Sequence, residues 1–545
     1  MTKIIYTTDA LNASNISGLE TIDLNQADFV DNRISLEASS AIQVTNISQN
    51  ITNLYFCFGR CYRISETFDI PDNVTNIDYI FYNSAIKRGP KFGSGITNWC
   101  YHIFKDCVNL VYPPDLSRMT NVTGLYGAFE NCVNMKTAPA LNINRNYSEY
   151  YGFDNIFNGC RNMTTAPNLP SPEKPAGVSI VRTFGLNQAF YECHKMQGTP
   201  NIPYGTPELY FTFTRCKAME NAPIIPDTVT SMQSTFYGCE SMVEPPTIPN
   251  SVIYMPSTFG NCKSMRNMPD IPSSLTDLGS TFINCTNITT IKTLPSSINS
   301  LSSTFAGCTG LTSFPTFSDS VVAMSGTFAR CTQMVNTPTL PANVTTIASL
   351  YNGCVNVVNV APIPQKVVYM NSTFENCTSL LNAPIIPASV NYAANLFKNC
   401  VSLTGNVVIQ SQNVVNCNGI FNGLEKNVNV YIPIEGDTQL YGWTCKTTAP
   451  EGYLQTYYSK ALPAPRYTNL FDENGVQQAK QPYGSPTNRY MWITNTSLNY
   501  ARNTAADKVI HLAQCATYES LINEGYSTST RTNGVLLFDI NSYSG

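Results

Sequence analysis

Residues 234–262 read STFYGCESMVEPPTIPNSVIYMPSTFGNC, and this stretch contains one complete repeat of a pattern that runs through most of the chain. The marker of the repeat is Phe-x-x-Cys, which recurs with an interval of 23 residues. The regular part of the cysteine column is Cys193, Cys216, Cys239, Cys262, Cys285, Cys308, Cys331, Cys354, Cys377 and Cys400, after a longer first unit. A fixed period of this length predicts stacked turns, that is, a solenoid.

The repeat array extends in both directions from this stretch. Its first unit ends at Cys61, the second has Ser84 in place of the cysteine, and a degenerate last unit ends at Leu424. The turns around residues 133–193 are enlarged, since the units that end at Cys160 and Cys193 contain 28 and 33 residues. We count about sixteen turns.

Several columns of the repeat carry large apolar side chains that can point inward. The residue three places after the cysteine is apolar, as in Met219, Met242 and Met265. No single turn can bury these side chains alone, but a stack of turns forms a continuous core. The Ser-Thr-Phe-x-x-Cys segment supplies a capping residue, so we expect a short helical turn there.

The chain has 19 cysteines, and fourteen of them occupy the same repeat column. In stacked turns neighbouring side chains of a column point the same way, which does not meet the directional requirement of a disulfide. The column therefore predicts a ladder of buried thiols that act as small apolar groups. A metal site is not expected, and no cofactor is expected.

A proline column limits the strands. Proline occupies the seventh position after the cysteine in ten units, for example Pro223, Pro246 and Pro269. Because proline cannot donate a backbone hydrogen bond, we expect narrow parallel sheets with strands of about three residues on that face.

The composition excludes some partners. Only 12% of residues are charged and the net charge is −4, so a basic surface for nucleic acid is not expected. No window of the sequence approaches the apolar length of a membrane span, and the N-terminus lacks the apolar run of a secretion signal. We therefore expect no membrane insertion.

The enlarged turns carry an aromatic cluster that is a candidate binding site. The first insertion reads NINRNYSEYYGF over residues 142–153, and its candidate binding residues are Tyr147, Tyr150, Tyr151 and Phe153. Exposed tyrosines favour recognition, because they offer a large contact area with few rotatable bonds. The alternative, that these rings pack the insertion onto the solenoid, has comparable weight.

The sequence contains no catalytic motif. It has three histidines, none of them in a zinc-binding spacing, and it lacks phosphate-binding loops and nucleophile elbows. Asp106, Glu130, Glu240 and Glu375 lie close to the cysteine column and are the candidates for a pair of carboxylates that cleaves glycans. Solvated turn positions explain them better, so we predict that the protein is not an enzyme.

Units such as VTSMQSTFYGCESM, followed by an Ile-Pro-x-Ser-Val segment, resemble the leucine-rich repeats of the BspA type, which occur in surface proteins of gut Bacteroidales and in their phages. The resemblance implies a leucine-rich-repeat solenoid over residues 51–424. We expect an N-terminal cap or docking segment at 1–50 and a C-terminal cap or small domain at 425–545. The resemblance also implies adhesion or a structural role, and the family has no shared catalytic residues.

Three functions are compatible with these features. The first is a phage virion component, such as a tail fibre or peripheral adhesion protein, that binds other virion proteins or a glycan or protein of the host surface. The second is a bacterial cell-surface adhesin, and a glycan depolymerase ranks third. Localisation in the virion is therefore expected, with the bacterial cell surface as the alternative, and a homo-oligomer is compatible with both.

Overall fold

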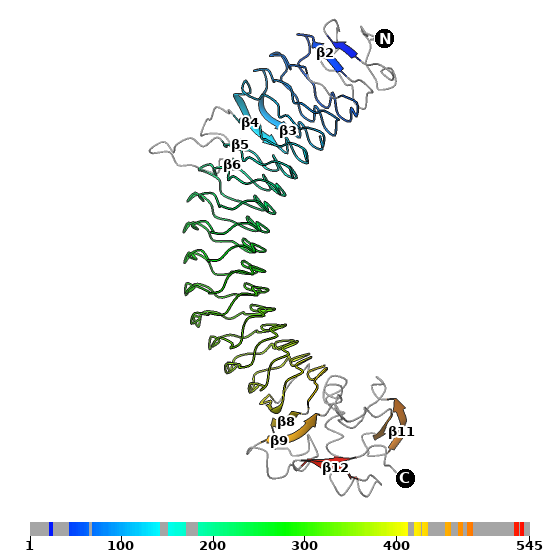
Figure 1. Ribbon diagram of the computed structural model, residues 1–545, viewed down its shortest axis with the longest axis vertical. Coiled ribbons are helices and arrows are strands. Elements are labelled where there is room, and N and C mark those ends of the chain that lie inside the picture. Colours follow the sequence, from blue (N-terminus) through cyan, green and yellow to red (C-terminus); the bar gives the residue numbers. More distant parts are fainter. Residues whose placement is uncertain are drawn as a thin grey trace. The chain divides into compact units, whose positions relative to one another are not determined.

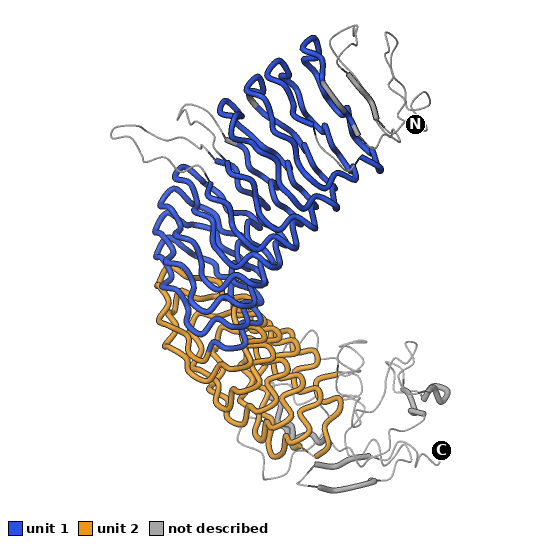
Figure 2. The backbone as a smooth tube through the Cα atoms, turned by 45° about the horizontal axis from the view of Figure 1, so that its top comes forward, with its two compact units in different colours: residues 1–288 blue, residues 289–545 orange. Residues whose placement is uncertain are grey.

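The computed structural model describes residues 21–24, 43–64, 68–141, 151–169, 184–411, 419–426 and 428–433, together with five further strands. The chain divides into two compact units, residues 1–288 and 289–545 (Figure 2). The dividing point lies inside the repeat array. The domain boundaries predicted at 50/51 and 424/425 stay predictions.

In each unit the repeats form stacked turns (Figure 1). Backbone N–H groups of one turn donate to carbonyls of the next turn, as from Phe236 N to Thr258 O (2.9 Å) in unit 1 and from Phe374 N to Leu396 O (3.0 Å) in unit 2. The predicted leucine-rich-repeat-like solenoid is therefore present in both units.

The prediction of short helical turns was wrong for the described residues, which contain no helix of any kind, and so none long and apolar enough to cross a membrane. In the segment before Cys239, every second N–H donates within the turn and the others donate to the next turn, from Ser234 N to Pro256 O (3.0 Å) and from Gly238 N to Gly260 O (2.6 Å). Ser234 and Gly238 have left-handed φ angles of 51° and 75°. An α-helix requires consecutive right-handed residues, so stacking of the turns replaces it.

The core of each unit is a stack of rings and thiols. The Phe213 and Phe236 rings lie 5.5 Å apart with an interplanar angle of 6°, and in unit 2 the Phe374 and Phe397 rings lie 5.6 Å apart at the same angle. The described cysteines are all buried and unbridged, which agrees with the predicted thiol ladder. The methionines three places after the cysteines, such as Met242, are completely buried.

The proline column has a stronger effect than predicted. On that face the turns are joined by single parallel bridges, such as Asn221 with Glu244 and Asn336 with Asn359, in place of strands of three residues. Pro223 follows Asn221 after one residue, and it cannot continue the ladder because it lacks an N–H.

Longer strands occur at one place in the described residues 48–404. β3 (Thr97–Tyr101), β4 (Asn121–Tyr126), β5 (Tyr151–Gly152) and β6 (Phe184–Gly185) form a parallel four-stranded sheet in the order β3-β4-β5-β6. This sheet lies in unit 1, in the turns just before and within the enlarged region.

The remaining strands belong to the two ends of the sequence. In unit 1, β1 (Thr21–Leu24) pairs in parallel with β2 (Gln43–Ile47). In unit 2, β7 (Gly405–Val408) pairs in parallel with β8 (Val428–Pro433), and β9 (Tyr453–Tyr458) joins β8 antiparallel. β10 (Tyr467–Phe471) pairs with β11 (Gln477–Pro482), and β12 (Thr528–Thr532) with β13 (Val535–Phe538), both antiparallel. The two terminal caps and the count of sixteen turns stay predictions.

Candidate binding surface

The first turns of unit 1 carry aromatic side chains at positions where later turns carry serine. The residue five places before the cysteine column is Ser234, Ser257 or Ser280 in the central repeats, but Phe56, Tyr79 and His102 in the first three. All of these residues have left-handed φ angles, for example 53° at Phe56 and 51° at Ser234. The backbone is thus the same, and only the side chain that it directs outward has changed.

Together with their neighbours these side chains form a continuous surface that we call the aromatic face. It consists of Tyr55, Phe56, Tyr79, Tyr82, Trp99, Tyr101, His102 and Tyr126.

The rings of the aromatic face contact one another from turn to turn. The Tyr55 and Tyr79 ring centroids lie 6.0 Å apart, those of Tyr79 and His102 5.1 Å, and those of His102 and Tyr126 5.3 Å. Tyr55 and Tyr101 are 38% and 39% exposed, the His102 side chain is mostly buried, and the other rings are half-buried. Pairs of aromatic rings at these separations stabilise each other, so the face is held in place before any partner arrives.

The sheet β3–β6 sets the position of Trp99 and Tyr101. Tyr101 of β3 is paired with Tyr126 of β4, while the intervening Cys100 is paired with Leu125 and both point into the core. Trp99 and Tyr101 therefore lie on the outward side of the sheet, with ring centroids 5.8 Å apart and an interplanar angle of 19°.

Two glycines allow the indole of Trp99 to lie flat on the sheet. A Cβ at Gly124 would lie 2.7 Å from Trp99 Cε3, and a Cβ at Gly152 would lie 2.1 Å from Trp99 Cη2. Both distances are too short for any other residue, so β4 and β5 are built to receive this ring.

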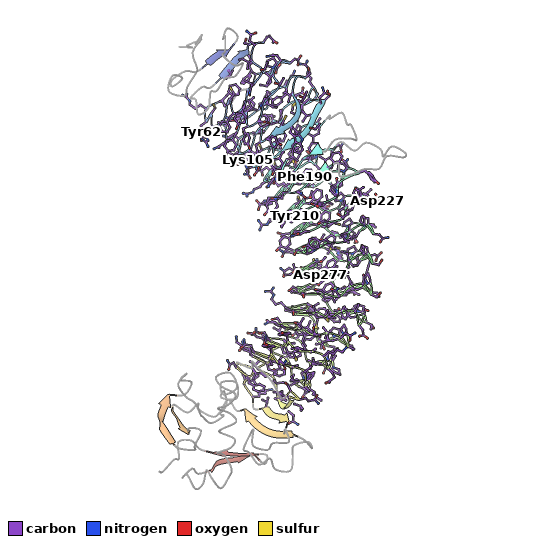
Figure 3. All side chains as sticks on the ribbon, turned by 180° about the vertical axis from the view of Figure 1, so that it is seen from behind. Tyr62, Lys105, Phe190, Tyr210, Asp227 and Asp277 are labelled. Atoms are coloured by element: carbon purple, nitrogen blue, oxygen red, sulfur yellow. The ribbon has the colours of Figure 1, made fainter. Side chains whose placement is uncertain are left out.

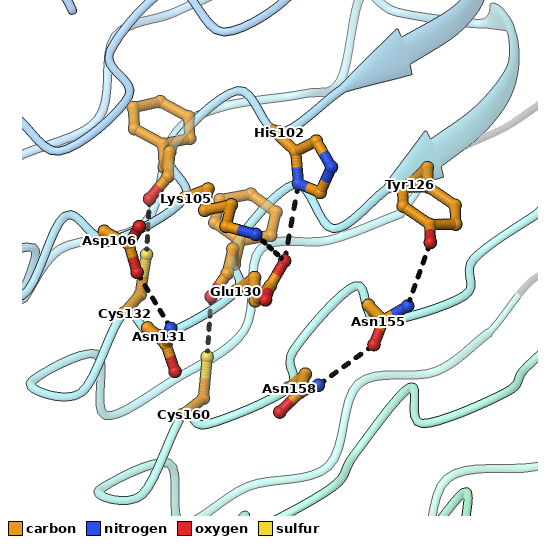
Figure 4. A network of polar contacts seen from close by, with 12 residues as sticks. His102, Lys105, Asp106, Tyr126, Glu130, Asn131, Cys132, Asn155, Asn158 and Cys160 are labelled. Carbon is orange, nitrogen blue, oxygen red and sulfur yellow. Dashed lines mark hydrogen bonds and ion pairs between the residues drawn. The ribbon is translucent and has the colours of Figure 1, made fainter.

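A polar network lies beside the rings (Figure 4). Glu130 Oε2 lies 2.9 Å from Lys105 Nζ and 3.4 Å from His102 Nδ1, and Asn131 Nδ2 donates to Asp106 Oδ1 (2.8 Å). Burial alone would raise the pKa of the Glu130 carboxyl, but His102 and Lys105 hold that pKa below its ordinary value. The acidic side chains of this network are therefore already matched within the protein.

Other charged side chains form ladders between turns of unit 1 farther along the chain. Glu192 accepts hydrogen bonds from Arg161 (2.7 Å) and Arg215 (2.6 Å), and it is mostly buried. Figure 3 shows Lys105 and Tyr210 along the same side of unit 1, with Asp227 on the other side. Tyr210, 38% exposed, packs against Phe211 with ring centroids 4.3 Å apart, so aromatic residues reappear on this side in the turn that follows the sheet.

Three of the four candidate carboxylates, Glu130, Glu240 and Glu375, do not have the environment of a glycosidase acid. Glu240 lies between Lys217 (3.3 Å) and Lys263 (3.1 Å), and Glu375 lies 2.9 Å from Lys398. Burial alone would raise the pKa of Glu375, but Lys398 holds that pKa below its ordinary value, and Lys263 and Lys217 likewise lower the pKa of Glu240. A general acid requires a raised pKa. In the described part of the chain, His, Cys, Asp and Glu side chains form no group that could hold a metal ion.

Of the candidate binding residues predicted in the enlarged turns, the structure describes only some. Tyr147 and Tyr150 lie outside the described residues, and Tyr151 is described only through its backbone in β5. Phe153 is completely buried, and its ring stacks on that of Phe184 with centroids 6.0 Å apart. The Phe153 side chain therefore belongs to the core, as in the packing alternative. A binding role for the three tyrosines stays a prediction.

Comparison with known proteins identifies the repeat. The family described as BspA type leucine rich repeat region matches in six copies, over residues 14–111, 183–312, 232–357 and 302–427. These residues make up well over half of the sequence, so the chain belongs to the BspA-type leucine-rich repeat family. The first matched region begins inside the segment predicted as an N-terminal cap.

Solved structures with a similar fold are also leucine-rich repeat proteins. One from Bacteroides ovatus has 18% identity and a TM-score of 0.38, covering 71% of this chain and 79% of that chain. A leucine rich cell surface protein from Faecalibacterium prausnitzii has 17% identity and a TM-score of 0.33, covering 61% and 83%. No relative was found among the curated proteins.

Leucine-rich repeat proteins are in general non-enzymatic binding proteins, and the matched family indicates no enzyme. The family match suggests a role in binding or adhesion. The predicted fold family is therefore confirmed.

Proposed function

We propose that the protein is a non-enzymatic adhesion protein of a phage virion, a tail fibre or other peripheral component, and that it attaches through the aromatic face. The observation that carries the proposal is the chain of ring contacts from Tyr55 through Tyr79 and His102 to Tyr126. Exposed tyrosine and tryptophan rings dominate binding surfaces because they offer a large area at low entropic cost.

The form of the surface supports binding rather than core packing. Phe56, Tyr79 and His102 occupy positions that are filled by serine in turns with the same backbone, such as those of Ser257 and Ser280. The core of those later turns is complete without them. The aromatic side chains of the first turns are therefore not needed to close the solenoid.

The location in a virion rests on the sequence resemblance, and a bacterial cell-surface adhesin is the second candidate. Labelling with gold-tagged antibody against the full chain separates the two, when applied to purified phage particles and to uninfected bacteria. Label on particles, together with the protein in the mass spectrum of purified virions, supports the virion component. Label on uninfected cells alone assigns the protein to the cell surface.

The role of the aromatic face is tested on the same material. The double variant Tyr101→Ala, Tyr126→Ala should reduce attachment to the target surface about tenfold, because two adjacent anchors are lost. The matched control is Tyr369→Ala, which removes a ring of unit 2 that is 45% exposed and stacks on Tyr392. Equal attachment by the two variants would show that the face is not the binding surface.

A further inference from the structure

The aromatic face is rich in rings and poor in aliphatic side chains. In the described residues 51–141, the exposed large apolar residues are Tyr55, Tyr62, Tyr101, Val108 and Tyr112, so four of the five are tyrosines. Exposed aliphatic side chains occur in later turns, at Ile224, Ile253, Val322, Val335, Leu381 and Ile385. A protein partner is usually held by apolar anchors that enter well-packed pockets. The aromatic face instead presents flat rings with hydroxyl groups at their edges.

The charges of the aromatic face are matched internally. Glu130 is paired with Lys105, Asp78 accepts a hydrogen bond from Tyr101 N (2.8 Å), and the Arg60 guanidinium lies over the Phe56 ring at 5.9 Å. Asp106 is bound by Asn131, as described above. A charged partner requires a surface of opposite charge, and the charges beside the aromatic face are compensated by one another.

The arrangement of the rings suits a ligand that extends along the stack. The rings of Tyr55, Tyr79, His102 and Tyr126 follow one another at separations of 5.1–6.0 Å, one turn after the next. Trp99 adds a flat surface beside Tyr101, supported from below by Gly124 and Gly152. A polymer of similar units can therefore meet an aromatic ring at each turn.

We infer that the aromatic face binds a neutral glycan chain. The C–H faces of its sugar rings pack on the aromatic rings, and its hydroxyls exchange hydrogen bonds with the tyrosine hydroxyls and the neighbouring Asn155, whose Nδ2 lies 3.4 Å from Tyr126 Oη. This assignment rests on the proposed function and specifies its ligand. Neutral sugars combine apolar faces with many hydroxyls and carry no charge, which matches the three properties above.

Affinity electrophoresis in native gels tests the assignment with the full-length protein. The gels contain a neutral polysaccharide, in turn a glucan, a mannan, a galactan and a xylan, and polygalacturonate serves as the acidic comparison. At least one neutral polysaccharide should retard the protein. The double variant Tyr101→Ala, Tyr126→Ala should bind it about tenfold more weakly, a loss of about 1.4 kcal/mol, whereas Tyr369→Ala binds as the parent protein does.

The variant Tyr101→Phe, Tyr126→Phe keeps the rings and loses the hydroxyls, so it should retain more binding than the alanine variant. Circular dichroism checks that each variant is folded. Retardation by none of the neutral polysaccharides, by polygalacturonate alone, or to the same degree in the alanine variant would overturn the assignment. If attachment to the target surface falls in the alanine variant while no neutral polysaccharide binds, the proposed function stands and the partner is a protein.

Discussion

The thiol of Cys239 donates a hydrogen bond to the carbonyl oxygen of Phe213 in the preceding turn, with an Sγ–O distance of 3.2 Å. The same oxygen accepts the N–H of Cys216, at 3.0 Å. Equivalent thiol bonds recur along both units, from Cys262 to Phe236 O in unit 1 and from Cys400 to Phe374 O in unit 2. The cysteine column is therefore a ladder of directional contacts between turns as well as a column of small apolar groups.

This ladder predicts the cost of removing a thiol. Cys239→Ala should lower the free energy of unfolding by about 1–2 kcal/mol, because it removes a hydrogen bond and leaves a small cavity. Cys239→Ser should cost less, since a serine hydroxyl can donate to the same carbonyl and Ser84 occupies this column naturally. Urea denaturation followed by circular dichroism measures both. Equal losses in the two variants would show that the hydrogen bond contributes nothing.

Stability should fall in alkaline solution. Burial raises the pKa of Cys107 and Cys354 from 9.0 to about 12. Between pH 9 and 12 the unfolded chain therefore releases thiol protons that the folded chain retains, so the free energy of unfolding decreases as pH rises, by about 1.4 kcal/mol per pH unit for each such thiol. Below pH 9 this contribution is constant.

Urea midpoints measured with reductant at several pH values from 8 to 11 test this dependence. The double variant Cys107→Ala, Cys354→Ala has two fewer of these thiols, so its midpoint should decline less steeply than that of the parent protein. Parallel declines would mean that these two thiols do not contribute to the pH dependence.

The fit between Trp99 and the sheet makes Gly152 sensitive to substitution. In Gly152→Ala the new methyl group would lie 2.1 Å from Trp99 Cη2, so the indole must move, at a cost of about 1–3 kcal/mol. In a background with Trp443 and Trp492 changed to Phe, acrylamide should quench Trp99 fluorescence more strongly in this variant. Gly198→Ala is the control, because its Cβ would meet Ala166 at an ordinary 3.9 Å. Unchanged quenching in Gly152→Ala would contradict the described position of the indole.

Tyr351 takes the place of phenylalanine in the core stack of unit 2, and its buried hydroxyl makes no hydrogen bond. The Thr337 side chain lies near this hydroxyl without the geometry of a hydrogen bond to it, and Thr337 Oγ1 accepts from Ala361 N (2.8 Å). Tyr351→Phe should therefore raise the free energy of unfolding by about 1 kcal/mol, as the desolvated hydroxyl is removed and the ring stack is kept. A less stable variant would mean that the hydroxyl has a partner in solution.

The sequence was sufficient for the fold family because the period and the inward columns are strict. Phe236, Cys239 and Met242 lie where the spacing predicts, in the core. The local backbone was not predictable in the same way. The Ser-Thr-Phe segment has the residues of a helix start, but left-handed φ angles at Ser234 and Gly238 turn alternate N–H groups toward the next turn, and that preference comes from stacking.

The aromatic face was not predicted from the sequence, because its residues are single exceptions within the repeat columns and not part of an insertion. Phe56, Tyr79 and His102 depart from the serine that later turns carry five places before the cysteine, and this departure is readable from the sequence. The contact of Trp99 with Gly152 could not be predicted from the sequence, because an insertion changes the spacing between the turns that carry these two residues.

Hydroxyl-radical footprinting tests most directly whether the aromatic face is the attachment surface. The full-length protein is oxidised in two states, free in solution and attached to the particles or cells on which the gold-tagged antibody detects it. Mass spectrometry then measures the modification of each tyrosine. Tyr55, Tyr101 and Tyr126 should be protected in the attached protein, while Tyr254 and Tyr369 are modified equally in both states. Equal modification of Tyr55, Tyr101 and Tyr126 in the free and attached protein would contradict the account.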